Sequence, residues 1–567
     1  MLRHVLAISL LLAACAVPGP APVAADTIWI RGDLVTIDAQ NPRATALAAR
    51  DGRIVEVGSD ADVLRHRGPS TVVVDLDGKT MLPGFLDGHS HFINSLSVAT
   101  QANVYPPPFG KGDSIAGIVA TLKQLQQDQA IGKGELIMAY GYDGSVLQDG
   151  RELCAADLDA HFPDNPVFVG HVSLHGAVLN SAALAKYGVT AATKTPAGGV
   201  ILRQEGSDEP AGLVMETAYL PIFSQLPKPS PADLLVRLEQ GQQIYAAAGI
   251  TTAHEGASHL SDIAILKQGA QQQKLYLDVV AFPFITDFEQ ILRTHKAASF
   301  GRYDNRLKLA GVKVTLDGSP QGRTAFFTTP YLTGGPGGEA DWKGEPTFPE
   351  AEIDKAFARV HQLGLPLIVH CNGDAAVDLF LRCFQKTYGS DVTGDHRTGI
   401  IHSQFVRKDQ LQKYREWNLI PSFYTEHTYF FATTHEENRG VEQAHFSSPM
   451  RAALDLGIRC SNHTDFNVAP IDQMFVVWSA VNRVSREGEV IGKDQRITPL
   501  EALRAITLDT AYWYREEDQK GSLEKGKLAD LAILDRNPLE VEPMAIKDIV
   551  VLETIKEGAS IYRKEAK

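Results

Sequence analysis

Apolar and polar residues alternate in short runs at both ends of the chain. Near the N-terminus these runs are rich in β-branched residues and are separated by Asp51-Gly52 and Asp77-Gly78, a pattern typical of strands and turns. The C-terminal end has the same pattern of short apolar runs, at 531–534 and 549–552. We therefore expect residues 27–80 and 515–567 to form one small β-sandwich domain built from both chain ends.

The middle of the chain alternates apolar runs with longer helix-like stretches, the pattern of βα units on a parallel sheet. Eight runs are candidate strands: 81–91, 250–255, 275–284, 307–317, 365–371, 398–405, 419–424 and 458–465. Candidate helices between them include 350–363, 375–386 and 449–456. Eight such units predict an α/β fold of the (β/α)8 TIM-barrel type over residues 81–514. The gap after the first strand is too long for a structureless loop and predicts an inserted subdomain at about 92–248.

The composition is ordinary for a globular protein. Hydrophobic residues make up 44% of the 567 residues, and 68 acidic against 54 basic residues give a net charge of −14. The acidic balance and the lack of a Lys/Arg-rich run argue against nucleic-acid binding, whereas a small-molecule substrate is compatible with them. The oligomeric state stays open, a homodimer included.

The first residues form a segment of their own. Arg3 and His4 precede an apolar run at 5–12, and two small residues then lead to Cys15, the order of a secretory signal peptide. Residues 12–15 resemble the bacterial lipobox, in which the cysteine becomes the lipidated first residue. We expect a lipoprotein-type signal at 1–15, a flexible tether at 16–26, and export to the bacterial cell envelope, with membrane contact only through a lipid anchor at Cys15 that faces the periplasm or the cell surface. The alternative is an ordinary cleaved signal with an incidental cysteine.

Histidines and one aspartate fall at the ends of candidate strands. His89 and His91 end the first strand two residues apart, so that both rings would point to one face. His370 ends the fifth strand, His402 lies on the sixth and Asp465 ends the eighth. In a barrel these carboxyl ends converge on the face that carries the active site. A lone His-x-His pair is a weak signal, but the five residues together predict a metal site.

The same residues carry a resemblance to a known family. The stretch Pro83-Gly84-Phe85-x-Asp87-x-His89-x-His91, with the later histidines and Asp465, resembles the amidohydrolase superfamily. Blocks around His175, Lys313 and His370 and the C-terminal stretch 497–531 narrow the resemblance to the YtcJ-like branch, which includes N-substituted formamide deformylase. The sequence departs from the family at the end of the eighth strand, where His463-Thr464-Asp465 stands in place of the usual Ser-Asp ending.

The resemblance implies a divalent metal cofactor. In related members the lysine at the position of Lys313 is carboxylated, which turns a cation without a lone pair into a bridging carboxylate and requires a pKa lowered by burial. With that modification the ligands His89, His91, Lys313, His370, His402 and Asp465 would hold two ions; without it, His89, His91, His370 and Asp465 would hold one. Nitrogen and carboxylate ligands suit Zn²⁺, with Mn²⁺, Co²⁺, Ni²⁺ and Fe²⁺ as alternatives. Lys313 could instead pair with Asp317 or extend to solvent.

The resemblance also implies hydrolysis of a carbon–nitrogen bond in an amide, formamide or N-acyl compound by metal-activated hydroxide. Asp465 would move the proton of the water to the leaving nitrogen, and His402 or the metal would polarise the carbonyl. His175, Arg323 and His427 are candidates for substrate binding, against a structural role for His175 and a carboxylate partner for Arg323. A lactone or ester hydrolase with the same site and a catalytically inactive surface-tethered binding protein are the competing functions.

Overall fold

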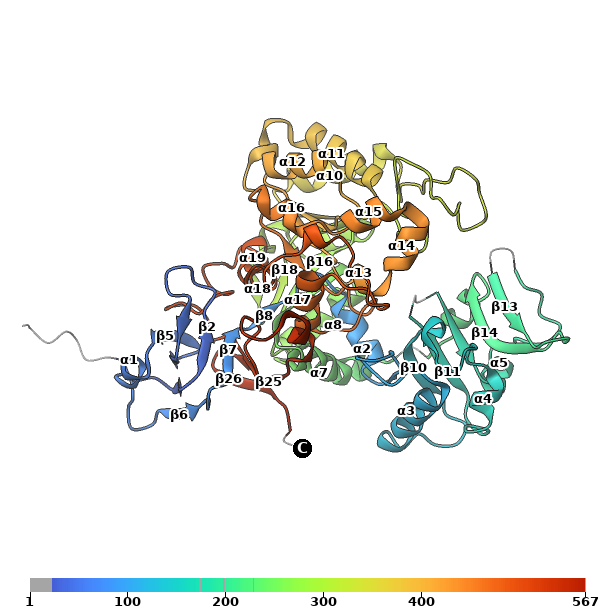
Figure 1. Ribbon diagram of the computed structural model, residues 1–567, viewed down its shortest axis with the longest axis horizontal. Helices are drawn as coiled ribbons and strands as arrows, with labels where there is room; N and C mark the ends of the chain where they lie inside the picture. The colour runs from blue at the N-terminus through green and yellow to red at the C-terminus, as the bar shows by residue number, and fades with distance from the viewer. Residues whose placement is uncertain (1–22, 173–174, 197–198, 228, 566–567) are drawn as a thin grey trace, which may run out of the picture.

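The computed structural model describes residues 23–172, 175–196, 199–227 and 229–565 (Figure 1). The predicted signal peptide, Cys15 and most of the predicted tether lie outside the described residues. Within the described part of the chain, no helix has both the length and the apolar character needed to cross a bilayer.

Two five-stranded sheets, in which all but one pairing is parallel, form the centre of the molecule. Their orders are β17-β18-β16-β15-β8 and β19-β20-β21-β22-β23. The strand bounds are β8 Phe85–Leu86, β15 Ile250–Ser258, β16 Asp278–Pro283, β17 Tyr303–Asp304, β18 Leu307–Leu309, β19 Val312–Thr315, β20 Leu367–Cys371, β21 Gly399–His402, β22 Ile420–Phe423 and β23 Ser461–Asn462. Among the described strands of these two sheets, β17 and β18 form the antiparallel pair. The chain is therefore a mixed α/β fold.

The two sheets contact each other at two separate places. On one side Phe284, just after β16, forms a parallel bridge with Lys313 on β19. On the other side the Asp465 amide donates to the His89 carbonyl, and the Ser422 hydroxyl donates to the Gly88 carbonyl. Residues at the carboxyl ends of strands in both sheets are thereby held in one region.

Helices follow or precede these strands on the outside, as the apolar pattern predicted. The helices predicted at 350–363, 375–386 and 449–456 correspond within two residues to α10 (Glu350–Gln362), α11 (Asp374–Tyr388) and α16 (Met450–Asp455). In Figure 1, α10 and α11 lie together at the top of the molecule, next to α12 (Lys408–Glu416).

Strands from both ends of the chain share one six-stranded sheet, with the order β26-β25-β24-β7-β2-β3. The bounds are β2 Asp33–Val35, β3 Arg43–Ala44, β7 Thr80–Pro83, β24 Leu531–Leu534, β25 Val551–Lys556 and β26 Ala559–Arg563. A second sheet, β5-β4-β1-β6, contains only N-terminal strands: β1 Thr27–Ile30, β4 Ala46–Arg50, β5 Arg53–Gly58 and β6 Val72–Asp75. One apolar cluster, which includes Trp29 and Leu531, draws side chains from both sheets.

The first predicted barrel strand, 81–91, is wrong in its bounds because the chain changes sheets within it. Its first part is β7, which pairs with β24, and only β8 pairs with β15. The change occurs at Gly84, where a Cβ atom would lie 2.4 Å from Thr251, so that no larger residue fits. Pro83, which has no backbone N–H to donate, precedes this point.

Between β8 and β15, the residues from β9 to β14 form a separate unit with its own sheet, β13-β14-β12-β11-β10-β9, whereas α2 (Phe92–Val98) and α7 (Pro231–Ala247) pack into the central core. The bounds are β9 Ala102–Asn103, β10 Ile137–Tyr142, β11 Val167–His171, β12 Gly176–Leu179, β13 Gly199–Arg203 and β14 Pro210–Glu216, with α3 at Ile115–Asp128. Two apolar clusters lie wholly within this unit. Figure 1 shows it at the lower right, beside the rest of the molecule. An ion pair of 2.9 Å between Asp143 and Arg486 joins it to the loop after α17 (Gln473–Asn482).

A buried network of charged side chains joins the start of β16 to the C-terminal strands. Asp278 Oδ2 lies 2.6 Å from Lys520 Nζ and 2.7 Å from Lys556 Nζ. Lys556 also contacts Asp530 at 2.7 Å, and Lys520 contacts Glu516 at 2.7 Å. Each buried charge thus has an opposite partner, as a low-dielectric interior requires.

Candidate metal centre

The predicted ligands gather at the carboxyl ends of the parallel strands. Lys313 lies on β19, His370 on β20 and His402 is the last residue of β21. His89 and Asp465 lie in the segments that follow β8 and β23. The premise that His89 and His91 share a strand is wrong, because β8 ends at Leu86, yet both rings reach the same carboxylate.

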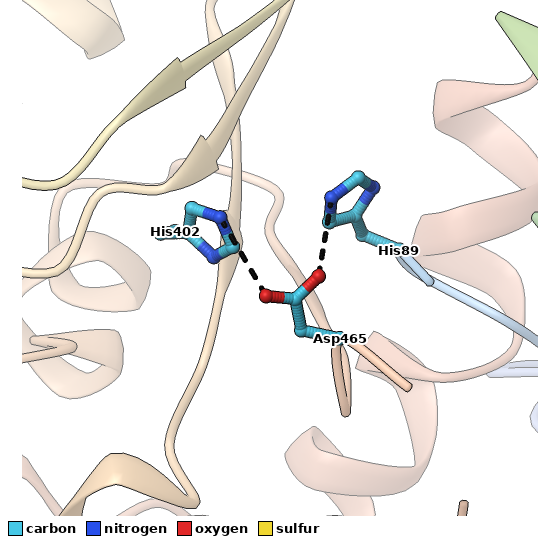
Figure 2. A group of neighbouring side chains, drawn as sticks. All are labelled: His89, His402 and Asp465. Carbon is cyan, nitrogen blue, oxygen red and sulfur yellow. Dashed lines mark ion pairs between the residues drawn. The ribbon is translucent and has the colours of Figure 1, made fainter. Parts of the chain in front are cut away.

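Asp465 lies at the centre of the group. Its Oδ1 is 3.6 Å from His89 Nε2 and 3.5 Å from His91 Nε2, and its Oδ2 is 4.0 Å from His402 Nε2. Figure 2 shows His89 and His402 on opposite sides of the carboxylate. Oδ1 is buried and makes no hydrogen bond with any described residue. A buried carboxylate oxygen in this state is costly unless a cation or proton compensates it.

The distances fit a metal ion better than direct hydrogen bonds. Two atoms that each bind a tetrahedral zinc ion at about 2.1 Å lie about 3.4 Å from one another. The contacts of Asp465 Oδ1 with His89 and His91 match this spacing and exceed the usual hydrogen-bond length. The donor set therefore fits a divalent cation between these three side chains.

His370 and His402 form a second pair of converging nitrogens. His402 Nε2 lies 3.1 Å from His370 Nδ1. The other nitrogen of His370, Nε2, lies 3.0 Å from Asn372 Nδ2, 3.4 Å from the Gly318 carbonyl and 3.5 Å from Asp317 Oδ1. Because Nε2 has these partners on the far side of the ring, His370 presents Nδ1 towards His402.

Lys313 is buried with its amine against the candidate ligands. The side chain is only 2% exposed, and Nζ lies 3.3 Å from His89 Nε2. Burial lowers the pKa of Lys313 to about 8. The interpretation that it extends to solvent is wrong. Asp317, its suggested partner, instead accepts the backbone N–H groups of three residues, Phe326, Asn372 and Gly373.

Burial sets the protonation states of the group. It lowers the pKa of His89 and His402 well below the ordinary histidine value and that of His370 to about 3. Burial would raise the pKa of Asp465, but the interaction with His91 and the nearby His402 lower it. Burial would also lower the pKa of His91, but Asp465 and Glu255 raise it above the ordinary histidine value. Neutral imidazoles and an ionised carboxylate are the forms that bind a metal ion, so His91 would lose its proton when it binds one.

The backbone is strained at two of the candidate ligands. The φ angle is +69° at His402 and +54° at Asp465, a region that residues with a Cβ rarely adopt. Ser403, next to His402, also has a positive φ of +44°. Strain of this kind persists where surrounding contacts hold it, and it is concentrated at functional sites.

Sequence reasoning missed two buried histidines behind these ligands. His254 on β15 lies against His89, and His463 after β23 lies against His402. Burial lowers the pKa of His254 well below the ordinary value and that of His463 to about 3, so both rings are neutral. For His463, the sequence offered one signal, because this residue stands where the chain departs from the family pattern before Asp465.

The three candidates for substrate binding lie in different places. His427 is buried, with its ring 4.4 Å from that of Tyr424, which in turn lies 6.1 Å from the ring of His402. His175 lies in the inserted unit, where Nδ1 is 3.1 Å from Glu216 and the side chain is 62% exposed. Arg323 is half-buried and donates to the Thr333 carbonyl at 3.4 Å. The substrate-binding roles of all three stay predictions.

Comparison with known proteins places the chain in a family. The sequence profile of the amidohydrolase family matches residues 72–562, a range that includes all six candidate ligands. The chain belongs to the amidohydrolase family. The resemblance inferred from the motifs is thereby confirmed.

Similar proteins within the amidohydrolase family cover nearly the whole chain. N-substituted formamide deformylase of Arthrobacter pascens is 24% identical over 552 residues, which cover 95% of this chain and 98% of the relative. Putative amidohydrolase YtcJ of Bacillus subtilis (strain 168) is 24% identical over 555 residues, which cover 95% and 99%. The crystal structure of an uncharacterized metal-dependent hydrolase from Pyrococcus furiosus has a TM-score of 0.69 at 24% identity and covers 91% of this chain and 100% of that chain. This likeness shows a shared fold.

Proposed function

We propose that this amidohydrolase is a metal-dependent hydrolase that cleaves the carbon–nitrogen bond of an amide, formamide or related N-acyl compound. The observation that carries the proposal is Asp465 Oδ1, a buried carboxylate oxygen that makes no hydrogen bond with any described residue and lies at metal-ligand spacing from His89 and His91. The name of the Arthrobacter relative supports the choice of bond. A bound divalent metal, with Zn²⁺ as first choice, lowers the pKa of water from about 15.7 to about 7 and so supplies the nucleophile.

Lys313 completes a set for two ions if it is carboxylated. In that reaction the neutral Nζ forms a bond to the carbon of CO₂ and loses one proton to solvent, which leaves a carbamate. A pKa lowered to about 8 supports this step, because a substantial share of the amine is then neutral near pH 7 to 8. The ligand set is then His89, His91, Lys313, His370, His402 and Asp465.

Asp465 has separate tasks for its two oxygens. Oδ1 faces His89 and His91, so it is the oxygen placed to hold a cation. Oδ2, on the side of His402, is free to accept a proton from the attacking water and return it to the leaving nitrogen. His402 and His370 hold the other side of the centre.

Metal analysis combined with a substrate panel tests the function. We expect purified protein to contain a tightly bound divalent metal, to lose turnover of N-formyl and N-acyl amines after chelation, and to regain it with Zn²⁺. The same panel should include esters and lactones, since these use a similar nucleophile. Tight metal binding without turnover of any amide would refute the proposal and favour either ester hydrolysis or a binding function, according to the remaining substrates.

We also propose that the two central sheets form one (β/α)8 barrel from β8 to about residue 514, with an inserted subdomain that contains β9 to β14 and a β-sandwich of residues 27–83 and 515–567 beside it. The contacts of Phe284 with Lys313 and of Ser422 with Gly88 support closure, since they join the two sheets at two separate places. An experimental structure with an open gap between Ser422 and Gly88 would contradict it.

For the chain ends we propose export and lipid anchoring at Cys15, supported by the signal-like order of residues 1–15. Fractionation of cells that express the wild type and Cys15→Ser tests this. Equal release of both proteins into the soluble fraction would argue for a signal with an incidental cysteine.

A further inference from the structure

Two candidate metal ligands each have a second histidine directly behind them. His89 Nδ1 lies 3.2 Å from His254 Nε2. His402 Nδ1 lies 3.1 Å from His463 Nε2. In both pairs the other nitrogen of the front ring, Nε2, is the one that faces Asp465.

The contacts continue behind His254 to a hydroxyl and a backbone carbonyl. His254 Nδ1 lies 2.5 Å from the hydroxyl of Tyr514. The same hydroxyl lies 2.5 Å from the carbonyl oxygen of Asp87. His254, Tyr514 and the Asp87 carbonyl thus form a chain of contacts behind His89, which we call the His254 relay.

An equivalent chain lies behind His402. His463 Nδ1 lies 2.9 Å from the hydroxyl of Ser422, and that hydroxyl lies 3.1 Å from the carbonyl oxygen of Gly88. We call this the His463 relay. The two relays end on the carbonyls of consecutive residues, Asp87 and Gly88, directly before His89 in the sequence.

The end of each relay fixes the direction of every hydrogen bond in it. A backbone carbonyl can only accept a hydrogen bond. Tyr514 and Ser422 therefore donate their single hydroxyl hydrogen to the Asp87 and Gly88 carbonyls, respectively. Each hydroxyl oxygen therefore accepts from the histidine Nδ1–H behind the ligand. Since a neutral imidazole carries one N–H, Nε2 of His254 and of His463 is an acceptor. It must receive Nδ1–H from His89 and from His402, respectively.

We propose that the His254 relay and the His463 relay are positioning devices that fix His89 and His402 as Nδ1–H tautomers, with the Nε2 lone pair of each aimed at the metal centre. The information that sets each tautomer lies in a backbone carbonyl three hydrogen bonds away. The four residues of the relays are positioning residues, because their ring nitrogens and hydroxyl groups all take part in the contacts of the relays: His254, Tyr514, His463 and Ser422.

Packing holds the first relay in place. The ring of His254 stacks on that of Phe282 at 4.9 Å with an angle of 17° between the planes. A Cβ atom at Gly256 would lie 2.2 Å from His89 Cε1, so the glycine admits the ring of His89 at this position. At Gly88, a Cβ atom would lie 2.5 Å from the Asn462 carbonyl, which keeps the segment that ends both relays close to β23.

This proposal rests on the proposed function, because a fixed tautomer is useful only if His89 and His402 bind a metal ion. It also rules out one of the two roles that the sequence suggested for His402. Because its Nε2 carries a lone pair, His402 cannot donate a hydrogen bond from that atom to a substrate carbonyl, and it serves as a ligand. Polarisation of the carbonyl then falls to the metal.

Tautomers can be read in the metal-free protein by long-range ¹H–¹⁵N correlation spectra after labelling with ¹⁵N-histidine. Signals are assigned through His89→Asn and His402→Asn. We expect Nδ1–H for both rings in the wild type. In Ser422→Ala, His402 should become a mixture of tautomers while His89 is unchanged; in Tyr514→Phe the reverse should hold, so each variant is the control of the other.

Ser422→Thr keeps the hydroxyl and should show the wild-type spectrum of His402. This variant separates the effect of the hydroxyl group from the effect of side-chain volume. Zinc affinity, measured by competition with a chromophoric chelator, should fall about 10- to 100-fold in Ser422→Ala and Tyr514→Phe and recover in Ser422→Thr. Circular dichroism confirms that each variant is folded.

Nε2–H on either ring of the wild type, or an unchanged His402 in folded Ser422→Ala, would overturn the proposal. The two proposals fail separately. Correct tautomers in a protein that binds no metal would refute the proposed function and leave the relays standing, whereas tight zinc binding with wrong tautomers would refute only the relays.

Discussion

The buried network at Asp278 makes a sharp stability prediction. Asp278→Asn keeps the shape of the side chain and removes its charge. The network of the wild type holds four cations and four anions, namely Arg306, Lys308, Lys520 and Lys556 with Asp278, Glu516, Asp530 and Glu557. The variant therefore leaves one uncompensated positive charge in a network in which Arg306 and Glu557 are partly exposed and the other side chains are buried.

The magnitude follows from the partners that remain. Breaking a buried ion pair by removing one member costs about 3–5 kcal/mol. Lys520 keeps Glu516 and Lys556 keeps Asp530, each at 2.7 Å, so we expect the lower end, about 3 kcal/mol. The network joins β16 to β25, so the loss should appear in the unfolding of the central sheets.

The pH dependence of this loss provides a second check. Burial would raise the pKa of Asp278, but the charges of Lys520 and Lys556 hold it below its usual range. A carboxyl with a depressed pKa contributes its stability above the unfolded value of about 3.9, and the contribution disappears as pH falls below that value. The difference between wild type and Asp278→Asn should therefore be full at pH 7 and shrink below about pH 4.

Urea unfolding followed by tryptophan fluorescence measures the difference. Asp518→Asn makes the same chemical change at an exposed position, between Glu516 and Lys520 in the sequence, and serves as the matched control. We expect the control to remain within about 0.5 kcal/mol of the wild type. A similar result for Asp278→Asn at pH 7 would refute the argument that the network stabilises the fold.

Two further predictions concern the metal centre. Asp465→Asn should lower kcat at least about 100-fold, because the proton acceptor is lost. Metal analysis should still find bound metal, since the amide oxygen can remain a ligand. A near-normal kcat would show that Asp465 does not transfer the proton. Lys313→Ala should reduce the metal content from two ions per chain to one, and added acetate should restore the second by supplying the missing carboxylate; two ions without acetate would show that Lys313 is not a ligand.

The candidate ligands could be predicted because their position in the sequence carries the signal. His370 and His402 follow apolar runs, and the carboxyl ends of parallel strands meet on one face whatever the exact strand bounds. This is why His89 lies in the same group as Asp465 and His402 although its strand ends at Leu86. The bounds failed there because the close packing of Gly84 against Thr251 is a tertiary contact.

The relays could not be predicted from the sequence in the same way. On β15, His254 and Glu255 are adjacent and both almost fully buried, so alternation does not show which of them lies beside a ligand. Tyr514 meets the Asp87 carbonyl across 427 residues of chain. Such a contact depends on how distant segments pack, and no local pattern contains it.

We propose that Lys313 is carboxylated and that, with His89, His91, His370, His402 and Asp465, it surrounds a two-metal centre. A crystal structure with anomalous data at the absorption edge of the bound metal tests it most directly. We predict two anomalous peaks, one near His89 and His91 and one near His370 and His402, with continuous density for a carboxylate on Lys313 between them. A single peak beside an unmodified Lys313, or no peak within this group, would contradict the account.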